Sequence, residues 1–193
     1  FGSLTFNSGG SVVIADASAT VLSGTSTAGS LDLDSTASIT DDGTADLTVT
    51  GNADLAGTSI ALDDTFDFGS LTFNSGGSVV IADASATVLS GTSTAGSLDL
   101  DSSASITDDG TADLTVAGNA DLAGTSIALD DTFGFGSLTF NSAGAVSISE
   151  AGATTLSGTN TASSLDLDST AGITNAASAS LTVTNNADVN GTS

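Results

Sequence analysis

The stretch FGSLTFNSGGSVVIADASATVLSGTSTAGSLDLDSTASITDDGTADLTVTGNADLAGTSIALDDTFD, residues 1–67, decides the fold because the chain repeats it almost three times. Residues 68–134 differ from it at only three positions, and residues 135–193 form a more diverged copy that stops at position 59 of the unit. A fixed period of this length is typical of stacked repeat architectures. The sequence therefore predicts a single β-solenoid over residues 1–193, with internal repeats 1–67, 68–134 and an incomplete 135–193.

Each unit alternates short apolar runs with turn sequences, which is the pattern of short β-strands. The predicted strands of the first unit are SLTF (3–6), SVVI (11–14), ATVL (19–22), SLDL (30–33), SIT (38–40), DLTV (46–49), ADL (53–55), SIAL (59–62) and a short ninth strand around 65–68. The segments between them, including NSGG, SGTSTAG and DDGT, have turn composition. Helices are not expected, because Glu150 is the only residue among the usual charged and amide helix formers.

Differences between the copies predict which side of each strand faces the core. Val13 is replaced by Ser147, whereas the neighbouring positions stay apolar in both copies. Because successive strand residues point to opposite faces, the retained apolar set is expected to face inward and Asp32, Asp34 and Thr48 outward. The inward set comprises Leu4, Phe6, Val12, Ile14, Leu22, Leu31, Leu33, Ile39, Leu47, Val49, Leu55, Ile60 and Leu62.

The connections are too short for crossover helices, which leaves an antiparallel meander or a parallel β-helix. Asp42-Gly43 is the one clear hairpin dipeptide of the first unit, and the third copy lacks it. We therefore predict an all-β chain folded as a parallel β-helix, or β-solenoid. Each unit is expected to make about three coils of roughly 22 residues.

Composition excludes several classes of partner. The chain has 23 acidic residues and no Lys, Arg or His, giving a formal net charge of −23. Nucleic-acid binding is excluded because it depends on basic side chains at phosphates, and an anionic membrane surface is disfavoured for the same reason. No apolar run is long enough to span a membrane. The 39% of apolar residues still supplies enough buried surface for folding.

The order SLTF, GGSVVI, DASATVL, AGSLDL, ASIT, ADLTVTGNADL and SIALDDTFDFG resembles the repeats of giant bacterial surface proteins of the filamentous-haemagglutinin-like adhesin class. The resemblance covers essentially the whole chain. It implies a right-handed parallel β-helix that is exported to the bacterial cell surface as an extracellular stalk or fibre. No receptor-binding motif accompanies these repeats, so the resemblance does not extend to a ligand.

Catalysis is not expected. Paired carboxylates such as Asp32 with Asp34, or Asp41 with Asp42, suggest glycoside hydrolysis, but that reaction needs one carboxyl held protonated beside an ionised one at a defined separation. Adjacent strand residues point apart, and aspartates in turns are solvated. Serine nucleophiles lack a His or Lys partner in this chain. We therefore predict a protein that is not an enzyme, with no catalytic residue and no organic cofactor.

Calcium is the one cofactor that the sequence suggests. Two Gly turns each carry three carboxylates, which suit a hard cation that prefers oxygen ligands. The candidate ligands are Asp41, Asp42 and Asp46 in the first copy and Asp108, Asp109 and Asp113 in the second. The third copy reads NAASAS at 175–180, so the fold itself cannot depend on ions there. The alternative interpretation is a solvated acidic turn.

These observations favour a structural, non-enzymatic segment that gives rigid length to an extracellular bacterial surface fibre or giant adhesin. The first alternative is the subunit of a self-assembling filament whose copies stack end to end through open β-edges. A second alternative is an acidic, calcium-dependent binding module. Neither end carries an atypical capping segment, so the expected partners are neighbouring repeats of the same protein or further copies of it.

Overall fold

The computed structural model describes residues 1–192, which form strands and turns and contain no helix. The strands are β1 Ser11–Asp16, β2 Thr20–Leu22, β3 Thr25–Ala28, β4 Ser30–Ser35, β5 Ile39–Asp41, β6 Asp46–Ala56, β7 Ile60–Asn74, β8 Ser78–Asp83, β9 Thr87–Leu89, β10 Thr92–Ala95, β11 Ser97–Ser102, β12 Ser105–Asp108, β13 Asp113–Gly124, β14 Ser126–Ser142, β15 Ala145–Glu150, β16 Thr154–Leu156, β17 Thr159–Ala162, β18 Ser164–Ser169, β19 Ile173–Asn175, β20 Ser180–Val183 and β21 Ala187–Gly191. Over this part of the chain, a helix long and apolar enough to cross a membrane is not found.

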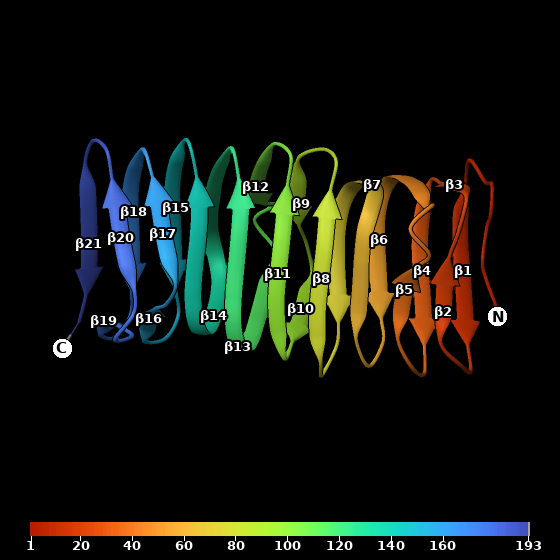
Figure 1. Cartoon of the computed structure of the whole chain (residues 1–193), viewed down its shortest axis with the longest axis horizontal. Helices are drawn as coiled ribbons and strands as arrows, with labels where there is room; N and C mark the ends of the chain where they lie inside the picture. Colours follow the sequence, from red (N-terminus) through yellow and green to blue (C-terminus); the bar gives the residue numbers. More distant parts are fainter. Residues whose placement is uncertain (193) are drawn as a thin grey trace.

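All of the strand pairs in residues 1–192 are parallel, and the paired residues lie 17 to 22 positions apart along the chain. Each such step is one turn of the solenoid, and the chain winds about ten turns into a rod with its termini at opposite ends (Figure 1). This confirms the predicted parallel β-solenoid and contradicts the antiparallel meander.

The predicted alternation of faces is also confirmed. Along β4, Leu31 and Leu33 are 2% and 0% exposed, whereas Asp32 and Asp34 point outward to solvent. The inward side chains of successive coils form one hydrophobic core that includes five fully buried phenylalanines. Burying each such side chain contributes about 1.5–3 kcal/mol, so this core is the main source of stability. Leu4 and Phe6 pack against it and are half-buried.

Two groups of strands differ from the prediction. The segment 25–28, which the sequence predicts as a turn, is strand β3, and it recurs as β10 and β17. Its inward residue Ser26 is polar, yet it is 3% exposed because its hydroxyl accepts a 3.1 Å hydrogen bond from the backbone N–H of Phe6. The predicted DLTV and ADL strands merge into β6, and SIAL, the ninth strand around 65–68 and the next SLTF merge into β7.

The two long sides of the rod are here named face A and face B. Face A consists of β1, β4, residues 53–56, residues 71–74, β9, β12, residues 127–129, β15, β18 and β21. Face B consists of β2, β5, residues 60–62, β8, β11, residues 120–123, residues 138–141, β16 and β19. In both cases the members follow one another from coil to coil.

Equivalent residues of successive copies lie on different faces. Val12 is on face A in β1, whereas Val79, its counterpart in the second copy, is on face B in β8. Val146, the third counterpart, is again on face A. The chain makes three turns between Val12 and Leu71, which both lie on face A. It reaches Val79 slightly less than half a turn later, before it returns to face A in β9. Each unit therefore makes about 3.4 turns, which refines the expected three coils and makes each coil shorter than predicted.

A short third row of strands widens one edge of the rod in each copy. In the first copy this row is β3 with residues 46–49 and 65–68, and the chain enters it from face B and leaves to face A. In the second copy the row is β10 with residues 113–116 and 132–135, and the chain passes from face A to face B. The widened edge therefore changes sides between the first and second copies.

Candidate functional site

The acidic turn of each of the first two copies is built by its own aspartates. Gly43 adopts a φ of 79°, a conformation that other residues rarely adopt, and this lets the chain reverse direction between β5 and β6. The Oδ1 of Asp41 accepts a 3.1 Å hydrogen bond from the Gly43 N–H, and the Oδ1 of Asp42 accepts bonds from the N–H and hydroxyl of Thr44 at 3.0 and 2.6 Å. Such aspartate turns form without an ion.

Three carboxylates meet beside this turn, from two neighbouring coils. One oxygen from each of Asp41, Asp63 and Asp64 lies within 4.8 Å of the others. The Oδ2 of Asp41 accepts a 2.9 Å bond from the Asp63 N–H, and the Oδ2 of Asp64 accepts a 2.8 Å bond from the Ala45 N–H. The second copy repeats this arrangement with Asp108, Asp130 and Asp131. Ca²⁺ takes roughly six to eight oxygen ligands, carboxylates among them, so each cluster offers part of such a set.

The structure brings together only part of the predicted calcium ligands. Asp41 and Asp108 belong to the two clusters, whereas Asp42 and Asp109 cap their turns. Asp46 and Asp113 are exposed at the start of β6 and β13 and are not in either cluster. Sequence reasoning missed the Asp-Asp pairs at 63–64 and 130–131. Their signal was present in the spacing, because the separation of Asp63 from Asp41 is one turn of the solenoid.

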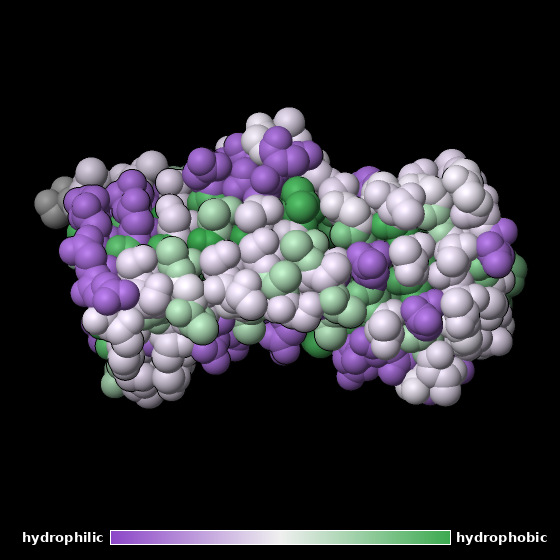
Figure 2. Space-filling model, turned by 90° about the horizontal axis from the view of Figure 1, so that it is seen from above, coloured by the Kyte–Doolittle hydropathy of each residue, from purple (hydrophilic) through white to green (hydrophobic). Residues whose placement is uncertain are grey.

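The acidic residues are distributed in separate patches. In Figure 2 the hydrophilic residues gather at several places along the rod, separated by pale surface made of small residues. The first cluster lies where the chain leaves face B and the second where it leaves face A, because the widened edge changes sides. The two clusters are therefore on opposite edges of the rod.

Outside these clusters, aspartates stack on the flat faces. Asp54 pairs with Asp32 of the preceding coil, and Asp121 pairs with Asp99 in the second copy. Partial burial, followed by the negative charges of Asp32 and Asp34, raises the pKa of Asp54. Burial and the neighbouring carboxylates raise the pKa values of Asp99 and Asp121 in the same way. These aspartates repel one another and have no basic partner.

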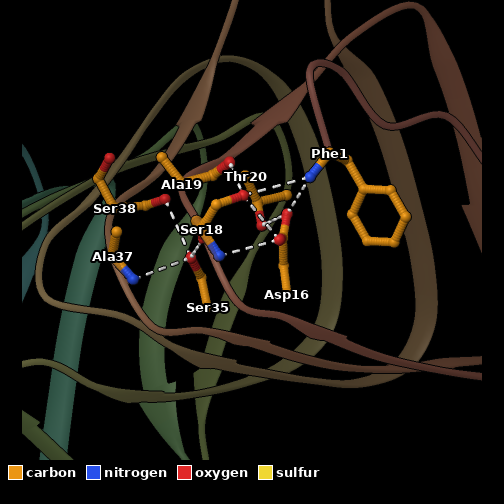
Figure 3. Close-up of polar contacts among 8 residues, drawn as sticks. All are labelled: Phe1, Asp16, Ser18, Ala19, Thr20, Ser35, Ala37 and Ser38. Atoms are coloured by element: carbon orange, nitrogen blue, oxygen red, sulfur yellow. Dashed lines mark hydrogen bonds and ion pairs between the residues drawn. The ribbon is translucent and has the colours of Figure 1, made fainter.

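A further acid is buried at one corner of each copy. Asp16 is 7% exposed and accepts hydrogen bonds from the backbone N–H of Ser18 at 3.0 Å, the Ser18 hydroxyl at 2.8 Å and the Thr20 hydroxyl at 3.1 Å (Figure 3). The terminal amine of Phe1 lies 2.7 Å from its Oδ2 and is the main cause that lowers the pKa of Asp16 to about 2. Asp83 and Glu150 are its counterparts and are 3% exposed.

The third corner acid shows that the role of this position is structural. Glu150 has the longer side chain, and its Oε1 reaches the backbone N–H of Phe135 at 2.9 Å while its Oε2 accepts from the hydroxyl of Thr154. In residues 1–192, no buried side-chain N or O atom lacks a hydrogen-bond partner. The corner acids thus close the turn by accepting hydrogen bonds, and their oxygens are already engaged.

Shallow grooves run along the corners next to these acids. One of them has a volume of about 670 Å³, and its lining includes Ala15, Gly57, Thr58 and the exposed carboxylate of Asp34. Similar grooves recur in the second and third copies at equivalent residues. The polar groups that line these grooves are hydroxyls, carboxylates, backbone groups and the side-chain amides of Asn74 and Asn190.

The chain belongs to the family described as repeats of unknown function (DUF5649), whose model matches residues 9–74 and 76–141. The two matches are nearly consecutive, so the family model describes one repeat that starts near position 9 of the unit used here. No curated protein and no solved structure matches the chain.

Proposed function

We propose that this member of the DUF5649 repeat family is a structural, non-enzymatic segment that gives rigid length to an extracellular bacterial surface fibre or giant adhesin. The observation that carries this proposal is the pairing pattern, in which strands of residues 1–192 pair only with the coil before and the coil after. A rod built in this way can grow by whole units without disturbing those already present.

The core supports the same role because it is continuous from coil to coil. Leu33, Leu55 and Phe73 follow one another on face A with 0% exposure, and Leu62, Ile81 and Leu100 do so on face B with at most 1% exposure. Removing solvent from one unbroken stack couples each coil to the next, which stiffens the rod against bending between units. The resemblance to adhesin repeats supports the extracellular bacterial setting.

Deletion of one whole unit tests the proposal. Removing residues 68–134 joins Asp67 to Phe135 and preserves the register, because it removes one period. We expect the product to remain β-rich and to be shorter by roughly 16 Å, from about 3.4 turns at about 4.8 Å each. Small-angle scattering measures this length. A matched deletion of residues 68–124 removes an incomplete unit and should fail to form a regular rod.

Two results would contradict the spacer role. One is a collapsed or unfolded product after the whole-unit deletion. The other is a hydrolytic activity on polysaccharide that the parent chain has and the shortened chain lacks.

The second candidate function is calcium-dependent stabilisation of the first two copies. We propose it because three carboxylates from two coils converge at each of two places, which a solvated turn does not require. A bound cation would offset the repulsion within Asp41, Asp63 and Asp64 and would tie one coil to the next.

A further inference from the structure

We infer that the aspartates on the flat faces of the first two copies, together with the grooves beside them, bind an extended protein segment that presents lysine or arginine side chains. These aspartates are here named the face triads. They are Asp32, Asp34 and Asp54 on face A and Asp99, Asp101 and Asp121 on face B. The interaction goes beyond the spacer role and does not depend on it, because it concerns the sides of the rod and not its length.

Each face triad is a compact group of carboxylates without a basic partner. Asp32 pairs with Asp54 of the next coil, and Asp34 lies two residues further along the same strand, so the three side chains point outward from neighbouring positions. The chain has no Lys, Arg or His to pair with them. Partial burial and the neighbouring carboxylates raise the pKa values of Asp54 and Asp121, so their ionised forms reduce the stability of the fold at neutral pH.

The third copy keeps these three aspartates although it loses other surface acids. Over the 59 unit positions that it shares with the first copy, the first copy has seven acids and the third has four. The four are Glu150, Asp166, Asp168 and Asp188. Glu150 closes a corner by accepting hydrogen bonds, whereas the three aspartates repel one another and have no comparable structural role. Retention of side chains that oppose folding indicates that they contact something outside the chain.

The third copy also identifies the kind of group that suits these carboxylates. The Nδ2 of Asn190 donates to the Oδ1 of Asp168 at 3.0 Å and to the Oδ1 of Asp188 at 3.1 Å. Ala56 and Ala123 hold this unit position in the first two copies and have no donor. The first two triads therefore present the same acceptors without an N–H between them. A cationic N–H donor makes a stronger hydrogen bond to a carboxylate than a neutral amide does.

A groove lies beside each of these two triads and crosses four successive coils. The groove of the first copy has a volume of about 670 Å³ and that of the second about 500 Å³. Coil by coil, the first passes Ala15, Asp34, Ala56 and Asn74. The second passes Ala82, Asp101, Ala123 and Ala143. Four coils span roughly 14 Å, which is the length of about four residues of extended chain.

The lining of the grooves favours a peptide with long basic side chains. Ala17, Gly57 and Gly76 provide small apolar surface, along which the aliphatic part of a lysine or arginine can lie while its charged end reaches the carboxylates. The exposed hydroxyls of Thr36 and Thr58 border the same groove and can bond to a peptide backbone. A simple polyamine has no backbone groups that would use these hydroxyls.

A single metal ion fits the face triads less well. In residues 1–192, two groups of three carboxylates have oxygens within 4.8 Å of one another, and the face triads are not among them. Their carboxylates are spread over two coils of a flat surface, which suits several separate N–H groups better than one small cation.

Calorimetric titration of the full chain with a tetralysine peptide, blocked at both ends and in buffer containing EDTA, tests the inference. We expect saturable binding that is lost when the lysines of the peptide are acetylated. Asp54→Asn with Asp121→Asn removes one carboxylate from each triad and should weaken binding about fivefold. Asp46→Asn with Asp113→Asn removes the same charge from exposed positions outside the triads and should change binding by less than about twofold.

A second pair of variants tests the place of binding at constant net charge. Ala56→Asn with Ala123→Asn gives the first two copies the donor of the third, and it should weaken peptide binding about fivefold because the amide occupies the carboxylates. Ala61→Asn with Ala128→Asn is the matched control, since these exposed alanines pair with Val80 and Ser147 and not with an acid. This control should bind the peptide as the parent does. Thermal melts identify any variant that has lost its fold.

The inference is overturned if the parent does not bind tetralysine, or if the two variants of either pair bind it equally well. Equal weakening by Asp54→Asn with Asp121→Asn and by Asp46→Asn with Asp113→Asn would indicate attraction to the net charge alone. Spermine that binds as tightly as the peptide would replace the protein segment by a free polyamine, and Ca²⁺ that displaces the peptide would assign the triads to a metal ion. Each of these results leaves the length of the rod, and thus the spacer role, unaffected.

Discussion

Thr87 donates a 2.9 Å hydrogen bond from its hydroxyl to the Oδ2 of Asp83, and both side chains are buried. The Oδ1 of the same carboxylate accepts from the backbone N–H of Ser85 at 2.9 Å and from its hydroxyl at 3.0 Å. The corner between β8 and β9 is therefore closed around one acid, in a chain that otherwise keeps most of its carboxylates at the surface.

Replacing this acid should destabilise the rod. Asp83→Ala leaves the Ser85 N–H and the Thr87 hydroxyl without their acceptor, and we expect a loss of about 2 kcal/mol in the free energy of unfolding. Urea melts measure the change. Asp101→Ala, which removes an exposed acid from the adjacent coil, is the control and should be neutral or slightly stabilising. Equal effects of the two variants would contradict the structural role of the corner acid.

The alternation of faces makes a second prediction. Leu100 is 0% exposed, and Leu100→Ala should cost about 2–5 kcal/mol because it leaves a cavity in the continuous core. Val80→Ser should change stability by less than about 0.5 kcal/mol, since the third copy has Ser147 at this outward position. If the two substitutions were equally costly in urea melts, the assigned direction of these side chains would be wrong.

The stacked aspartates predict how stability depends on pH. The pKa values of Asp54, Asp99 and Asp121 are raised above 3.8 by partial burial and by neighbouring carboxylates, so the folded state binds these protons more tightly than the unfolded state. Protonation of these three aspartates therefore adds to the stability of the folded state as the pH falls from neutral through their raised pKa values. This added stability is complete below pH 3.8 and is lost as the pH rises.

Urea midpoints measured between neutral pH and about pH 4 check this dependence. The triple variant Asp54→Asn, Asp99→Asn and Asp121→Asn should show a smaller rise on acidification and should be more stable than the parent at neutral pH. A triple variant with the same pH slope as the parent would show that these three groups do not control it.

Calcium makes the fourth prediction. At a concentration about 100 times the dissociation constant, one site adds about 2.7 kcal/mol to stability, so millimolar Ca²⁺ should raise the melting temperature. Calorimetric titration should find two sites per chain, one for each cluster. Asp63→Asn with Asp130→Asn should remove both, whereas Asp46→Asn with Asp113→Asn should retain them. If NaCl of equal ionic strength raised the melting temperature by the same amount, the effect would be general screening of the negative charges and not calcium binding.

The direction and the burial of the strand side chains could be predicted from the sequence, because successive side chains of a strand alternate between its two faces. Asp32 and Leu33 are adjacent, and the alternation alone assigns one to solvent and the other to the core. The alignment of coils was harder, because paired residues are 17 to 22 positions apart and corners absorb the difference. For example, Leu31 pairs with Ala53 and not with Leu55, which is the partner of Leu33.

Two kinds of residue were missed for related reasons. Ser26 is inward although polar, and a hydrophobicity pattern cannot recognise a side chain that is buried because it accepts a backbone hydrogen bond. Asp63 joins Asp41 across a turn, and this contact is visible only once the length of that turn is known. Charge spacing within one segment therefore predicted only part of each acidic cluster.

Because each unit makes about 3.4 turns, the number of copies sets the orientation of the last copy about the rod axis as well as the length of the rod. Each added copy lengthens the rod by the same amount. It also turns the following copy about the rod axis by slightly less than half a revolution. Val12 and Val146 share face A while Val79 lies on face B, so odd and even copies point in opposite directions. In a long array, gaining or losing one copy would turn everything beyond it by almost half a revolution, whereas gaining or losing two would nearly restore its orientation.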